Sequence, residues 1–85
     1  MLVKASPILA ASVDVYLREG DFADVLTQIQ NAHTAVEIGS YPFSRDGRLG
    51  ATLVVRGTDR ALIDKVVEKI VAAMTALGGE TKLVG

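Results

Sequence analysis

The chain has 85 residues, of which 49% are hydrophobic, and its nine basic and ten acidic side chains give a net charge of −1. This length indicates a single domain, 1–85, that can bury one compact core without a metal or a disulfide. The absence of cysteine excludes disulfides, a thiolate nucleophile and a thiol-ligated metal site, and the single histidine, His33, cannot build an imidazole-rich one.

Charge and hydropathy also narrow the partners that we expect. The lack of a basic excess argues against nucleic-acid binding through phosphates. No apolar run reaches the length of a membrane span. The N-terminal segment, residues 1–7, is too short to be a signal peptide. We therefore expect a cytoplasmic protein that does not contact a membrane.

The first third of the chain predicts a strand followed by a helix. Apolar and polar side chains alternate over residues 12–18, with Val13 and Val15 on the same face, which is typical of a half-buried strand. Asp21 is expected to cap the following helix, over residues 22–32, whose apolar residues recur at helical spacing.

The middle of the chain predicts a β-hairpin. A strand over residues 35–43 contains Pro42, which lacks a backbone donor, so this strand should lie at an edge of a sheet. Residues 44–48 form the turn, where Gly47 is expected at positive φ, and a strand over 49–56 follows.

The last third predicts a long helix and a short strand. Asp59 caps a helix over residues 59–77, which ends at Gly78 and Gly79, and residues 81–84 can form a final strand. The order β-α-β-β-α-β predicts an α+β, ferredoxin-like fold, a two-layer sandwich with both helices on one face of an antiparallel sheet. The first and third strands are then central, and the strand with Pro42 lies at an edge.

The segment from Gly39 to Phe43 is the main candidate for a functional surface. If Val36 and Ile38 point toward the helices, then Gly39, Tyr41 and Phe43 point away and form an exposed apolar patch with Tyr16, which is typical of a contact surface. The alternative is that Phe43 curls beneath the hairpin and Tyr41 is ordinary surface. The predicted interaction surface comprises Tyr16, Gly39, Ser40, Tyr41, Pro42, Phe43, Arg45 and Arg56.

Charged residues near this segment have two readings. Arg45, Arg48 and Arg56 either solvate the hairpin or bind an anionic ligand. The acidic residues predict no catalytic or metal site; we expect them to cap helices or to be solvated. They are Asp14, Glu19, Asp21, Asp24 and Glu37.

Two segments resemble a known family. Residues 38–43, Ile-Gly-Ser-Tyr-Pro-Phe, and residues 53–59, which end in Arg-Gly-Thr-Asp, are similar to the C-terminal region of the molybdopterin-binding-domain family. This MoaB/Mog-like family includes the N-terminal type of competence/damage-inducible protein A and the molybdopterin-binding part of FAD synthase. The resemblance covers about residues 7–77. Family members carry a preceding α/β domain with a Thr-Gly-Gly loop that binds pterin or nucleotide phosphates, and this sequence has no match to that loop.

The resemblance implies a non-catalytic, accessory C-terminal domain without a cofactor of its own, whereas the parent family suggests molybdopterin or a nucleotide. It would dock its open sheet face or the edge of its second strand against a missing N-terminal core domain or a second copy, as a homo-oligomer. Residues 1–8 are interpreted as the remnant of a linker. Two alternatives remain: a single-stranded RNA-binding module of KH or RRM type that stacks bases on exposed aromatics, and an ACT-like domain that senses a small ligand.

Overall fold

A computed structural model of the chain describes residues 7–84, so most of the predicted linker remnant lies outside the described residues. The elements are β1 (Leu9–Tyr16), α1 (Glu19–Ala32), β2 (Glu37–Arg45), β3 (Arg48–Gly57), α2 (Arg60–Ala76) and β4 (Glu80–Val84).

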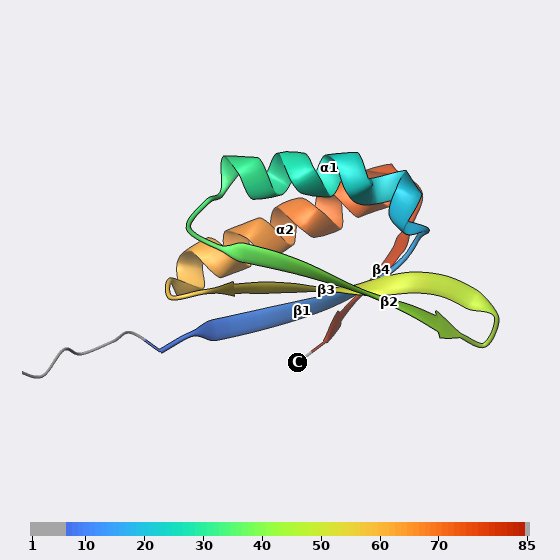
Figure 1. Cartoon of the computed structure of the whole chain (residues 1–85), viewed down its shortest axis with the longest axis horizontal. Helices are drawn as coiled ribbons and strands as arrows, with labels where there is room; N and C mark the ends of the chain where they lie inside the picture. Colours follow the sequence, from blue (N-terminus) through green and yellow to red (C-terminus); the bar gives the residue numbers. More distant parts are fainter. Residues whose placement is uncertain (1–6, 85) are drawn as a thin grey trace, which may run out of the picture.

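The strands form one antiparallel sheet in the order β2-β3-β1-β4. Both helices lie on one face of this sheet and leave the other face open (Figure 1). The predicted ferredoxin-like, two-layer fold is thus confirmed, with β1 and β3 in the centre and the Pro42 strand, β2, at an edge.

The core lies between the sheet and the two helices. The inward residues of the central strands and one stripe of α2 supply most of it, because these elements alternate or repeat apolar residues with the period of their backbone. The buried apolar side chains are Val13, Val15, Phe22, Val36, Ala51, Leu53, Val55, Ile63, Val66, Ile70 and Met74.

The two helix starts differ from each other in how they are capped. Asp59 caps α2 as predicted, since its side chain accepts hydrogen bonds from the backbone N–H groups of Ala61 and Leu62. The predicted cap of α1 by Asp21 is wrong. The N-cap is Arg18, whose side chain makes no capping bond, and Asp21 lies in the first turn, where its N–H donates to the Arg18 carbonyl.

The β2–β3 hairpin closes through a two-residue turn, which is shorter than the predicted one. Asp46 and Gly47 have φ values of 50° and 76°, as a type I′ turn requires, and Arg45 pairs directly with Arg48. The strands therefore extend to the arginines on both sides of the turn, and these side chains take part in the sheet.

Candidate interaction surface

The strand register decides which side chains face the open side of the sheet. Residues that are directly opposite each other in antiparallel strands share a face. Tyr41 is opposite Thr52 and Phe43 is opposite Gly50, whereas the neighbouring β3 residue Leu53 is buried beneath the helices. Gly39, Tyr41 and Phe43 consequently face away from the helical layer, as the alternation of β2 predicts.

Two residues of the predicted surface lie on the other side of the sheet. Ser40 is opposite Leu53 and Pro42 is opposite Ala51, and both partners belong to the core. Ser40 and Pro42 therefore cannot contribute side chains to the open face. The remaining predicted residues, Tyr16, Gly39, Tyr41, Phe43, Arg45 and Arg56, share it with residues of β3 and β4.

The aromatic rings of the open face are covered by arginines. Tyr16 and Phe43 meet edge to face, with ring centroids 5.3 Å apart. The Arg45 guanidinium lies 3.9 Å from the centroid of Phe43, and that of Arg48 lies 4.1 Å from the centroid of Tyr16. Such cation–π contacts stabilise both partners and keep the arginine carbon chains on the rings. Tyr41 stands apart and is 50% exposed.

Two glycines let these rings lie flat on the sheet. A Cβ atom at Gly50 would come within 2.7 Å of the Phe43 ring and 2.5 Å of the Val15 carbonyl oxygen, so no larger residue fits there without movement. A Cβ at Gly39 would come within 3.1 Å of the Tyr41 ring. Glycine on β2 and β3 thus makes room for aromatic side chains, which is one established way to pin a strand register.

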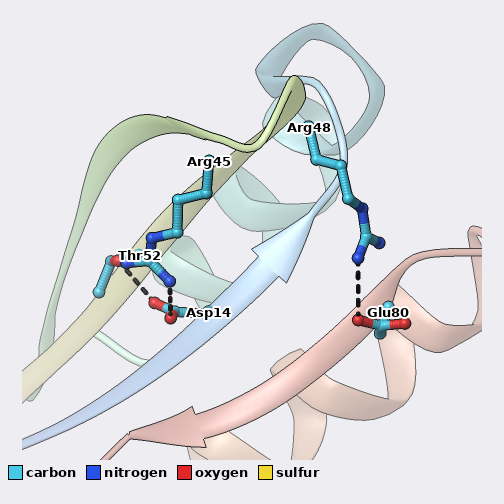
Figure 2. A network of polar contacts seen from close by, with 5 residues as sticks. All are labelled: Asp14, Arg45, Arg48, Thr52 and Glu80. Atoms are coloured by element: carbon cyan, nitrogen blue, oxygen red, sulfur yellow. Dashed lines mark hydrogen bonds and ion pairs between the residues drawn. The ribbon is translucent and has the colours of Figure 1, made fainter.

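Asp14 forms a polar centre beneath the arginines. It lies in the middle of β1 on the open face, yet it is only 3% exposed. Its carboxylate accepts hydrogen bonds of 2.6 Å from the Thr52 hydroxyl and 2.6 Å from the Arg45 guanidinium (Figure 2). The expectation that Asp14 is solvated or caps a helix is therefore wrong, because side chains from β2 and β3 cover it.

The hydrogen bond from Thr52, together with the bond and charge of Arg45, holds the pKa of Asp14 below its ordinary value of 3.8, although desolvation acts in the opposite direction. A second pair, between Arg48 and Glu80, spans 3.4 Å and joins the hairpin to β4 (Figure 2). Two of the three arginines are thereby matched to acids of this same sheet.

The outer edge of β2 is closed by a side chain that the sequence analysis missed. The Gln30 amide of α1 donates to the Val36 carbonyl at 2.8 Å and accepts from the Ile38 N–H at 2.8 Å. The amide occupies two backbone groups that a further strand would use. Further along, Pro42 has no N–H to offer. We refer to Gln30 and Pro42 as the β2 edge block.

The surface hollows that stand out on residues 7–84 are open to solvent. A groove of about 430 Å³ lies between α2 and the β1–β4 side, lined in part by Ala11, Asp64, Val67 and Leu83. Within residues 7–84 there is no group of three or more side chains suited to hold a metal ion. None of the helices described there is long and apolar enough to cross a membrane.

The fold and this face define a small ferredoxin-like domain whose sheet is covered on one side and presents an arginine-capped aromatic cluster on the other. The model of the family described as "FAD synthase, middle domain" matches residues 7–78. The chain belongs to this family, which by its description is the middle domain of a larger protein, FAD synthase. The FAD synthase part of the predicted resemblance is confirmed, and the finer MoaB/Mog assignment stays a prediction.

Solved structures resemble the chain in fold alone. A de novo designed protein, Foldit4, is 18% identical with a TM-score of 0.71, and the match covers 92% of this chain and 94% of that one. A C-terminal segment of the alpha subunit of aIF2 from Pyrococcus abyssi is 14% identical with a TM-score of 0.55, covering 92% of this chain and 50% of that one. No curated protein sequence matches the chain.

Proposed function

We propose that this chain is a non-catalytic accessory domain of an FAD-synthase-type protein and that it docks through its open sheet face onto another domain of that protein. The observation that carries the proposal is a sheet face that neither helix covers (Figure 1) and that presents two aromatic features: the cluster of Tyr16 and Phe43 with Arg45 and Arg48, and the separate, half-exposed Tyr41. Tyrosine, phenylalanine and arginine are enriched in protein–protein interfaces, where they provide large contact area together with hydrogen-bonding groups.

The face has the properties that a docking surface needs. Tyr41 is half exposed, and its hydroxyl accepts a weak, 3.4 Å hydrogen bond from Arg56, so the ring can move onto a partner at little cost. Phe43 and Tyr16 are held in place by each other and by their arginines, which limits the entropy lost on binding. The open face is better suited to docking than the outer edge of β2, because the β2 edge block removes donors and acceptors there.

Titration of the chain into the purified remainder of its parent protein, followed by sedimentation velocity, tests the proposal. Tyr41→Ala should weaken the complex by about tenfold or more, as expected when a large aromatic contact of an interface is removed. Lys65→Ala, an exposed change on α2, is the matched control and should leave binding unchanged. Wild-type chain that does not bind, or binding that Tyr41→Ala leaves intact, would overturn the proposal. Binding to a mixed RNA oligomer with the same Tyr41 dependence would favour an RNA-binding module instead.

A further inference from the structure

The two edges of the sheet differ in how they are protected. The β2 edge block closes one of them. The other edge is β4, a strand of five residues without proline. In the described part of the chain, the side-chain hydrogen bond that reaches β4 goes to the carboxylate of Glu80 and leaves the outer backbone groups of the strand free. Unpaired groups of an edge strand are a template for another strand.

Apolar side chains accompany these free backbone groups. Leu83 is 68% exposed and Val84 is 42% exposed, and both line the groove between α2 and the sheet. Leu83 is opposite Val13 of the core, so it lies on the helical side of the sheet, where a neighbouring molecule could cover it. The β4 edge thus combines the hydrogen-bonding potential and the apolar surface that strand addition needs.

We propose that β4 pairs antiparallel with β4 of a second copy of this chain, about a two-fold axis at Thr81, so that the two sheets become one. An axis perpendicular to the sheet keeps the helices of both copies on the same side and requires that residues of the same face are opposite each other.

Charge selects this register. Glu80 and Lys82 both lie on the open face, because they are opposite Tyr16 and Asp14 of β1. With the axis at Thr81, Glu80 of each copy is opposite Lys82 of the other, which gives two cross-strand pairs of opposite charge. An axis at Lys82 would set two lysines opposite each other, and like charges in that position destabilise a sheet.

The remaining contacts of Glu80 and Leu83 fit the same arrangement. The pair between Glu80 and Arg48 is exposed and 3.4 Å long, so the carboxylate can turn toward a second copy at little cost. Leu83 is then opposite Gly79 of the second copy, where no side chain competes for space. A lysine on an edge strand usually hinders pairing with strands of other proteins. In the proposed dimer, Lys82 also pairs with Glu80 of the second copy, which favours a copy of the same chain over another partner.

Cysteine cross-linking tests the register directly, since the chain contains no cysteine of its own. Under mild oxidation Thr81→Cys should form a disulfide-linked dimer, because residue 81 is opposite itself across the axis. Leu83→Cys is the matched control and should form no disulfide-linked dimer, because residue 83 is opposite Gly79 and not opposite itself. No cross-link in Thr81→Cys, or a cross-link only in Leu83→Cys, would overturn the proposed pairing.

Charge exchange tests the origin of the specificity. Glu80→Lys and Lys82→Glu should each weaken dimerisation of the chain by about tenfold in sedimentation equilibrium, because two attractive pairs become repulsive. The double variant Glu80→Lys/Lys82→Glu should restore it. Circular dichroism establishes that each variant is folded. A monomeric wild-type chain, or a double variant as weak as the single ones, would contradict the proposal.

This self-pairing does not depend on docking through the open face. Tyr41→Ala should leave the Thr81→Cys cross-link unchanged. Thr81→Lys sets two lysines opposite each other on the helical side of the sheet, because residue 81 is opposite Val15, so it should weaken self-pairing and leave binding to the remainder of the parent protein unchanged. Each surface can therefore fail in its own experiment without affecting the outcome of the other.

Discussion

Asp14 and Arg45 form an ion pair on the open face of the sheet. Asp14 is buried, whereas the side chain of Arg45 is 49% exposed. Removal of the Arg45 side chain leaves the buried Asp14 carboxylate with Thr52 as its hydrogen-bond donor. Removal of the Arg48 side chain leaves the carboxylate of Glu80, which is exposed and which water can solvate. The two arginines of the hairpin therefore differ in importance, although both stack on aromatic rings.

Arg45→Ala should lower the free energy of unfolding by about 1–3 kcal/mol, the usual cost of leaving a buried polar group without its partner. Arg48→Ala is the matched control: it loses a similar cation–π contact, but its ion pair with Glu80 is exposed, so it should cost about 1 kcal/mol or less. Urea unfolding of both variants measures the difference. Equal losses would show that the Asp14 contact contributes little.

The same contact makes stability depend on pH in the acidic range. The folded protein holds the pKa of Asp14 below 3.8, so the unfolded chain binds more protons near that pH. The stabilisation is present above pH 3.8 and is lost as the pH falls through the lower, folded pKa. The difference in unfolding free energy between wild type and Asp14→Asn should therefore shrink in acid. An Asp14 carboxyl that titrates above 3.8 by NMR would contradict this.

At the scale of the element, Gln30 acts as a substitute for a piece of backbone. Its amide bonds the Val36 carbonyl and the Ile38 N–H, and so ties the end of α1 to the start of β2. Because both backbone groups lie at the sheet edge, they would otherwise be open to water or to another strand.

Gln30→Ala should destabilise the protein by about 1–2 kcal/mol and accelerate hydrogen exchange at the Ile38 amide. Gln28→Ala, an exposed change in the same helix, serves as the control and should be close to neutral. The comparison is made by NMR-detected exchange. Unchanged protection of Ile38 in Gln30→Ala would refute the proposed edge closure.

The elements show which features the sequence could predict. Asp59 and the Asp46–Gly47 turn act through neighbours within three residues, so local patterns located the α2 cap and the hairpin. The Asp14–Arg45 pair joins residues 31 apart and exists only in the observed register, which a single sequence does not specify. The predicted surface includes Ser40 and Pro42 because they lie between surface residues in the sequence, but the alternation of β2 directs their side chains to the other face.

At the scale of the whole molecule, one core connects both helices with the strands β1, β2 and β3. Its buried residues come from β1, α1, β3 and α2, with Val36 at the entry to β2. A domain of this size with one continuous core usually unfolds in a single cooperative step. The described chain should therefore fold without the rest of its parent protein.

Urea unfolding should give coincident transitions by circular dichroism and by tyrosine fluorescence, with a slope of about 1 kcal/mol per molar urea. The two tyrosines, Tyr16 and Tyr41, report on the open face, and circular dichroism reports mainly on the helices. An earlier fluorescence transition would indicate that the sheet face loosens before the core does.

The Asp14–Arg45 pair has a further consequence for any molecule that settles on the open face. Covering a charge normally incurs a desolvation penalty, which grows when the charge has no counterion nearby. In this protein, folding has already buried Asp14, and Arg45 provides the opposite charge next to it. A partner that covers the open face would therefore displace water from an ion pair without net charge. It would also lower the local dielectric constant and so strengthen the attraction between Asp14 of β1 and Arg45 of the hairpin.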